Sequence, residues 1–125
     1  MAYQRRASDT EVLICEGAVV VGDVTLDRGV NIWYNAVLRG DEGPITVREN
    51  TNIQDGAVLH DGTYVGAGCT IGHGCVVHGC TVGKNTLLGM GAIVLNGARI
   101  GDDCIVGAGA LVTGTLDAPN ASLIM

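Results

Sequence analysis

The sequence contains no phenylalanine and one tryptophan, and aromatic residues make up 3% of its 125 residues. An interior built without large rings has to be filled by mid-sized aliphatic side chains. Hydrophobic residues still form 47% of the chain, and twenty glycines accompany them. A chain of this length is expected to fold as one domain that buries about two thirds of its unfolded surface. The composition therefore predicts a narrow, aliphatic, glycine-rich fold.

Basic residues are scarce as well. Seven Lys and Arg stand against thirteen Asp and Glu, a net charge of −6, whereas nucleic-acid binding requires a basic footprint. No apolar run is long enough to span a membrane, and no charged and then apolar leader is present. We therefore expect a soluble, cytoplasmic protein that binds neither nucleic acid nor membrane.

An aliphatic residue recurs every six positions along most of the chain, with one interruption after Leu38 and one step of five after Val77. The series is Ile14, Val20, Leu26, Ile32, Leu38, then Val47, Ile53, Leu59, Val65, Ile71, Val77, then Val82, Leu88, Val94, Ile100, Val106, Val112. A small residue usually stands four positions after each aliphatic, and a glycine often follows it directly. An aliphatic that fills the interior, a small residue at a tight corner and a glycine at the turn form the repeating unit.

Hexapeptide periodicity of this kind predicts a parallel β-helix, whereas a sandwich would show period-two strands at irregular spacing. We expect a single all-β domain of about five to six coils over residues 14–113. Residues 1–13 are expected to form a polar N-terminal cap or arm, and 114–125 a tail with no C-terminal helix. The interruption at 41–44 is expected to loop out of the coil.

The five cysteines are an odd number and contain no CxxC spacing, which argues against a thiolate zinc site. Cys69, Cys75 and Cys104 occupy the small-residue corner of the repeat, where they would act as small hydrophobes. Cys15 and Cys80 fall outside that position, so the pattern leaves them free to be exposed.

The chain has three histidines, His60, His73 and His78. His60 and His78 each follow an aliphatic and lie three repeats apart, so a fold with three repeats per coil stacks them one layer apart. Arg39 precedes them in the same column if the interruption loops out. Neutral imidazole is the commonest nitrogen ligand of zinc, and three histidines leave a fourth position for water. The pattern predicts a catalytic type of metal site, with zinc as the favoured ion and ferrous iron or cobalt as alternatives.

His73 stands two positions after an aliphatic, in a second column that it shares with Asp55, and Gln54 lies beside Asp55. This column lies on the preceding face of the prism, so His73 points away from His60 and His78. A neighbouring copy of the chain can supply it instead. Closed three-fold packing would form three equivalent sites, and the ligand geometry therefore predicts a homotrimer.

Several segments carry a family resemblance, and they span about residues 18–113. They are "GDVTL", "NIWYNAVLRGDEGPI", "NIQDGAVLH", "IGHGCVVHGCTVG" and "LLGMGAIVLNGARIG". On these segments the chain resembles the gamma-class carbonic anhydrase family, which implies a left-handed β-helix and a homotrimer with metal at each subunit interface. The resemblance assigns His60 and His78 as ligands from one subunit and His73 as the ligand from its neighbour.

The same resemblance implies roles for the surrounding polar residues. Arg39 and Asp41 match an intersubunit ion pair, and Gln54 and Asp55 match residues that line the site or support the interface. Gln54 is the one expected near the metal-bound water, and Glu42 matches an acidic residue implicated in proton transfer. Residues 59–65 form one uninterrupted repeat, without the acidic loop that many members carry there.

The function implied by the resemblance is hydration of carbon dioxide to bicarbonate, with Gln54 orienting the reactants. Glu42 is expected to carry the proton away, with Asp61 as a second candidate. Two alternatives remain open: a metal-dependent thioesterase or other hydrolase of the same family, and a non-catalytic trimeric metal-binding protein. Hexapeptide acyltransferases share the fold but need a single histidine, and they rank behind these readings.

Overall fold

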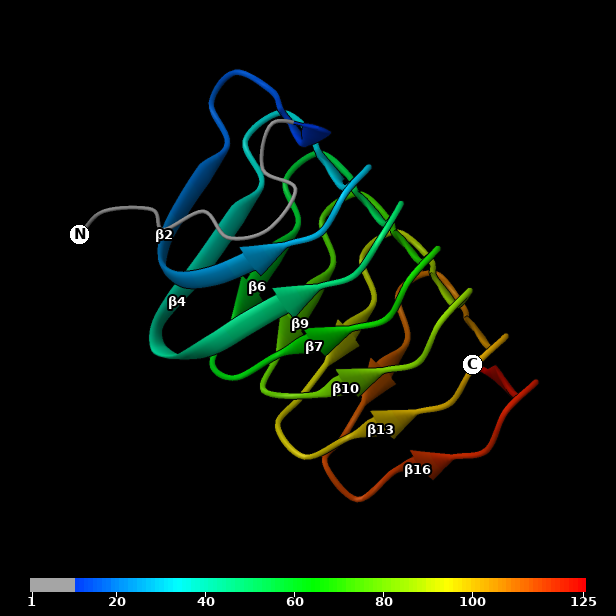
Figure 1. Ribbon diagram of the computed structural model, residues 1–125. Coiled ribbons are helices and arrows are strands. Elements are labelled where there is room, and N and C mark those ends of the chain that lie inside the picture. The colour runs from blue at the N-terminus through cyan, green and yellow to red at the C-terminus, as the bar shows by residue number, and fades with distance from the viewer. Residues whose placement is uncertain (1–10) are drawn as a thin grey trace.

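The computed structural model describes residues 11–125 as a triangular solenoid whose turns stack along one axis (Figure 1). Strands pair in parallel with strands one turn away, and a turn usually consists of three hexapeptides, as between Ile53 and Ile71. About six turns are present. The sequence prediction of an all-β parallel β-helix is confirmed.

Three flat faces make up the prism. The first face contains β1 (Leu13–Ile14), β3 (Asn31–Ile32), β5 (Asn52–Ile53), β8 (Thr70–Ile71), β11 (Leu87–Leu88), β14 (Ile105–Val106) and β17 (Leu123–Ile124). The second face contains β6 (Val58–His60), β9 (Val76–His78), β12 (Ile93–Val94), β15 (Leu111–Val112) and the first halves of β2 (Val19–Leu26) and β4 (Val37–Val47). The third face contains β7 (Tyr64–Val65), β10 (Thr81–Val82), β13 (Arg99–Ile100), β16 (Asp117–Ala118) and the second halves of β2 and β4.

The interior is a single column of aliphatic side chains with small residues at its corners. The aliphatic of each hexapeptide points inward; Leu38, Leu59 and Ile71 are fully buried. Ala57 and Cys75 fill corner positions and are equally buried. Because aliphatic burial is the main favourable term in folding, the six-residue pattern determines which way each strand faces.

The interruption at residues 41–44 does not leave the coil as a separate loop. These residues belong to β4, which runs continuously around the corner between the second and third faces. The register shifts at this point, so that Asp23 of β2 lies opposite the segment 41–44. Gly40 permits the close approach, because a Cβ there would collide with the carbonyl group of Asp23. The expected loop is therefore a large bulge within a strand, with four residues opposite one.

The ends of the solenoid differ from the expectation in one respect. Residues 114–125 do not form a tail, because β16 and β17 continue the third and first faces and Ala118 is buried. The expected cap over 1–13 lies mostly outside the described residues, and Leu13 already belongs to the first strand. No helix within residues 11–125 has the length and apolar character required to cross a membrane.

All five cysteines are free thiols, and Cys69, Cys75 and Cys104 are buried as predicted. Cys80 is buried too, which corrects the expectation that it is free to be exposed. The reason is the shortened repeat between Val77 and Val82. A corner residue lies two positions before the next aliphatic, and counting back from Val82 places Cys80 at that corner.

We expect Cys80 to resist alkylation by iodoacetamide in the folded protein at about pH 9, because only the thiolate reacts. Burial raises the pKa of the Cys80 thiol from 9.0 to about 12. Since the pKa is raised, the stability gained from burying the neutral thiol is present below pH 9 and is lost as the pH rises toward 12. Peptide mass mapping with and without urea measures the protection, and the partly exposed Cys15 is the internal control. Equal alkylation rates for Cys80 and Cys15 in the folded state would contradict the buried corner.

Candidate metal centre

Arg39, His60 and His78 stack on three successive turns, at the edge between the second and third faces. Arg39 of β4 pairs with His60 of β6, which pairs with His78 of β9. The column predicted from the repeat count is confirmed. We call this edge, with Asp41 and Glu42 of the β4 bulge, the His60 edge.

A buried threonine holds the turns that follow the two histidine strands. The Thr63 hydroxyl donates to the carbonyl oxygen of His60 at 2.9 Å and accepts from the backbone N–H of Gly79 at 2.9 Å. Thr63 is 1% exposed, so water does not replace these bonds. The hydroxyl therefore links the backbone next to His60 to the backbone next to His78.

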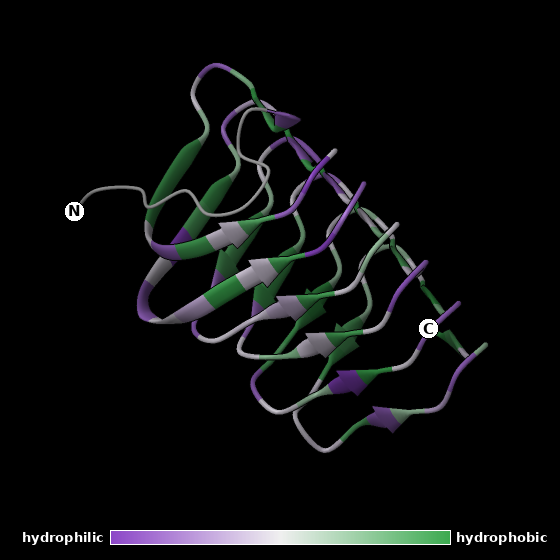
Figure 2. Ribbon diagram, in the orientation of Figure 1, coloured by the Kyte–Doolittle hydropathy of each residue, from purple (hydrophilic) through white to green (hydrophobic). Residues whose placement is uncertain are grey.

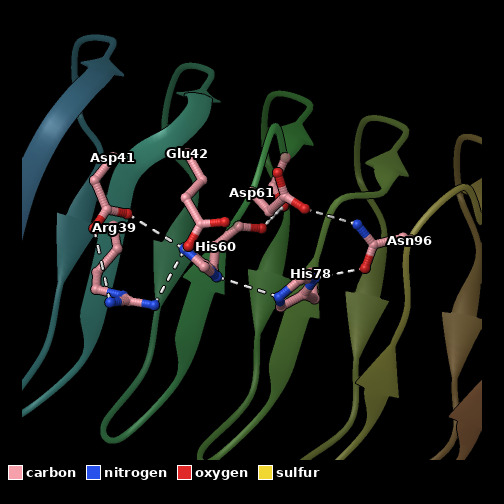
Figure 3. Close-up of polar contacts among 8 residues, drawn as sticks. Arg39, Asp41, Glu42, His60, Asp61, His78 and Asn96 are labelled. Carbon is pink, nitrogen blue, oxygen red and sulfur yellow. Dashed lines mark hydrogen bonds and ion pairs between the residues drawn. The ribbon is translucent and has the colours of Figure 1, made fainter.

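The His60 ring is enclosed by charged groups from β4 (Figure 3). The Arg39 Nη2 atom lies 3.1 Å from His60 Nε2, and the Asp41 Oδ1 atom lies 3.3 Å from the same nitrogen. A Glu42 carboxylate oxygen lies 3.6 Å from it. The His60 side chain is 10% exposed, whereas that of Glu42 is 67% exposed. The edge therefore combines a shielded imidazole with a carboxylate that reaches solvent.

The two imidazoles of this edge fit one metal ion. His60 Nδ1 lies 3.2 Å from His78 Nε2, and the rings are nearly perpendicular at 79°. Two nitrogen ligands at 2.0–2.1 Å from a tetrahedral zinc would be about 3.3 Å apart. Asp41, Glu42 and His60 also form a group of ligand-type side chains whose ligand atoms lie within 4.8 Å of one another. The donor set of this edge is thus suited to a divalent cation.

His73 lies at the opposite edge of the second face, where the first face ends. Its Nδ1 atom is 3.6 Å from Asp55 Oδ1, one turn below, which confirms the second predicted column. Gln54, Asp55 and His73 line a surface pocket of about 260 Å³ together with Trp33 and Asn52. We call this the His73 edge. The His73 side chain is 57% exposed, so its ring can meet a second molecule.

Arg39 and Asp41 pair within one chain at 3.7 Å. The predicted partnership between these two residues thus occurs already in the single subunit, although the role between subunits stays a prediction. Asp61, the second candidate for proton transfer, accepts a hydrogen bond from Asn96 at 2.9 Å through its carboxylate.

Asn96 is a residue of the site that the sequence analysis missed. Its Oδ1 atom lies 2.6 Å from His78 Nδ1. The available signal was its position two residues after Val94, which places it in the same turn column as Asp61 and Gly79. Amide side chains at turns are common for local reasons, so the position alone did not indicate a site.

The family described as bacterial transferase hexapeptide (six repeats) matches residues 44–79 and 79–114. These matches cover more than half of the chain. The chain belongs to this hexapeptide-repeat family. A crystal structure of a hexapeptide transferase family protein from Anaplasma phagocytophilum superimposes with a TM-score of 0.92 and 38% identity, over 97% of this chain and 73% of that one.

Curated relatives confirm the resemblance to gamma carbonic anhydrases. A probable carbonic anhydrase of Methanocaldococcus jannaschii is 48% identical over 57% of this chain and 47% of its own length. Gamma carbonic anhydrase 1, mitochondrial, of Arabidopsis thaliana is 40% identical over 59% of this chain and 30% of its own length. The matched part of the chain thus spans about a third to a half of these relatives.

Replacing Thr63 by Val should lower the free energy of unfolding by about 0.5–1.5 kcal/mol, because the side chain no longer bonds the His60 carbonyl oxygen and the Gly79 N–H, which keep only their bond to each other. Urea denaturation followed by circular dichroism measures the change. The matched control is Thr25→Val at a partly exposed strand position of β2, which should change the stability by less than about 0.5 kcal/mol. Equal stability of the two variants would show that the Thr63 hydroxyl does not hold the site backbone.

Proposed function

We propose that the protein is a gamma-type carbonic anhydrase that hydrates carbon dioxide to bicarbonate at metal sites shared between subunits of a homotrimer. The observation that carries the proposal is the division of three histidines between the two edges of one face. Two of them stack with ring nitrogens 3.2 Å apart at one edge. The third is exposed at the other edge, within a pocket that also contains Gln54.

The character of the second face supports the trimer. Its outward column is aliphatic on every turn, in register through Val19, Val37, Val58, Val76, Ile93 and Leu111. Val19, Ile93 and Leu111 are 45%, 37% and 63% exposed. The third face carries polar residues on β13 and β16, which Figure 2 shows in purple. A contiguous apolar face of this kind marks an interface.

Three prisms with their second faces toward a common axis bring unlike edges together. The His60 edge of one subunit then meets the His73 edge of the next, and the arrangement closes after three subunits. The neighbouring edge contributes His73 and, from the same pocket, Gln54 and Asp55. Each site would therefore contain three imidazoles, a side-chain amide and the carboxylates of the β4 bulge.

Zinc held by three imidazoles lowers the pKa of a bound water to about 7 and so supplies the nucleophile for carbon dioxide hydration. Ferrous iron and cobalt suit the same nitrogen donors. Gln54 can orient the substrate through its amide. The Asp55 carboxylate lies beside the His73 ring, with its Oδ1 atom 3.6 Å from His73 Nδ1, and this contact favours one orientation of the ring.

Glu42 is the better placed of the two candidates for proton transfer. Its carboxylate lies 3.6 Å from His60 Nε2 and is 67% exposed, so it can take up a proton at the site and release it to water. Asp61 is engaged by Asn96. Arg39 and Asp41 fix the His60 ring within the subunit, and the exposed part of the guanidinium can reach a carboxylate of the neighbour.

Stopped-flow measurement of carbon dioxide hydration tests the activity. The protein should be loaded with zinc or, without oxygen, with ferrous iron, and turnover should be abolished by a chelator. Hydrolysis of an acyl thioester without hydration of carbon dioxide would identify the hydrolase alternative. Full metal occupancy with neither activity would identify a non-catalytic metal-binding protein.

Mixing two inactive variants tests the shared site. His73→Ala and His78→Ala should each lose bound zinc, since each removes one of three ligands. In mixed trimers one interface combines the intact His60 edge of the first variant with the intact His73 edge of the second. A one-to-one mixture that has been dissociated and reassembled should recover about one quarter of the wild-type zinc content. Zinc content measured by mass spectrometry that stays at the level of the separate variants would contradict the intersubunit site.

A further inference from the structure

We propose that Asn96 is a positioning residue for His78, and that Asp61 sets its orientation across Gly79. The proposal rests on the proposed function insofar as it treats His78 as a metal ligand. The three polar residues lie at or just beyond the ends of β6, β9 and β12, at the outer side of the His60 edge (Figure 3).

The side-chain amide of Asn96 has one end for each neighbour. Its Oδ1 atom faces His78 Nδ1 at 2.6 Å, and its Nδ2 atom faces Asp61 Oδ2 at 2.9 Å. An ionised carboxylate only accepts hydrogen bonds. Asp61 therefore requires the NH₂ end of the amide, which leaves the carbonyl end for His78.

This arrangement selects one tautomer of the imidazole. A carbonyl oxygen only accepts, so His78 has to carry its proton on Nδ1 and donate it to Asn96. His78 Nε2 then carries the lone pair, which faces His60 Nδ1 at 3.2 Å. A metal-binding histidine generally donates its other ring N–H to such an outer partner, which fixes the ring and raises its basicity. Asn96 supplies that partner for His78.

Gly79 makes the arrangement sterically possible. It lies on the turn between Asp61 and Asn96, with a φ of 62°. A Cβ atom at Gly79 would collide with Nδ2 of Asn96. Because Gly79 has no side chain, the space on the intermediate turn is open. The Asn96 amide crosses this space and reaches Asp61, which lies two turns away.

Nitrogen NMR on the metal-free protein tests the tautomer without any turnover. With three histidines in the chain, ring signals of ¹⁵N-histidine-labelled protein can be assigned with single His variants. At about pH 8, the wild-type His78 ring should carry its proton at Nδ1. Asn96→Ala should convert it to a tautomer mixture, and Asp61→Asn should do so partially, because an amide at 61 no longer dictates which end of Asn96 faces His78. Asp117→Asn, which removes a charge on the third face, is the matched control and should leave the signals unchanged.

Cobalt titration of the same chelator-treated proteins gives the second readout. Asn96→Ala should bind cobalt about 10–100-fold more weakly than wild type. Asp61→Asn should have the smaller effect, a loss of affinity of about 10-fold. Gly79→Ala keeps both polar side chains but displaces the amide, so it should weaken binding by a similar factor. Combining Gly79→Ala with Asn96→Ala should add little, because both act through one contact. Size-exclusion and melting measurements show whether each variant remains folded.

The outcomes separate this inference from the proposed function. An unchanged His78 tautomer in folded Asn96→Ala, or a cobalt affinity equal to that of wild type, would overturn the positioning role while the metal site stands. Failure of the wild-type protein to bind cobalt would instead overturn the proposed metal site, and the NMR result would still decide whether Asn96 sets the His78 tautomer. Wild-type cobalt binding with no carbon dioxide hydration would overturn only the activity.

Discussion

The stacking of one turn on the next is the constraint on which every other feature depends. Backbone hydrogen bonds join each strand to the strands directly above and below it, so the spacing of residues along the chain becomes their order along the prism. A separation of three hexapeptides places two side chains one above the other, as for Asp55 and His73. Neither histidine column requires a special loop to bring its members together. Each requires only that the intervening turns keep their length.

The two turns that depart from the length of three hexapeptides both do so at the His60 edge. The turn that contains the β4 bulge is longer, since Asn31 pairs with Asn52. The added residues place Asp41 and Glu42 beside the His60 ring without disturbing the column of Arg39 and His60. A later turn is one residue short, since Tyr64 pairs with Thr81. The shortening moves Cys80 into the corner directly after Gly79, so the turn beside His78 is tight and carries no side chain.

Much of this architecture could be predicted from the sequence, because inward and outward positions alternate in a fixed order. The aliphatic series indicated the fold, and it carried the register correctly across the interruption between Leu38 and Leu59. Counting failed where the repeat changed length. The position of Cys80 was predicted by counting forward from Val77, the preceding aliphatic. The corner position is instead determined by the strand that follows, which contains Val82. The role of residues 114–125 was missed for a related reason: Ala118 takes the place of a larger aliphatic, and the series seemed to stop.

The role of Asn96 could not be predicted by counting repeats, for a different reason. A column argument relates residues one turn apart, and Asn96 contacts Asp61 two turns away across a glycine. This contact is possible only because Gly79, on the intermediate turn, has no Cβ atom. No sequence motif indicates such a contact.

His73 was limited in a different way, because its proposed site requires a second copy of the chain. The column that contains His73 was predicted correctly. In the proposed assembly, however, the other two ligands of its site belong to another copy of the chain. The evidence for that copy is the aliphatic column of the second face, which lies between the His60 edge and the His73 edge. In the proposed assembly, the apolar face lies between two unlike half-sites, and packing against further copies of the chain would complete both of them. The hydrophobic surface and the ligand geometry are separate observations, and both support the same proposed assembly.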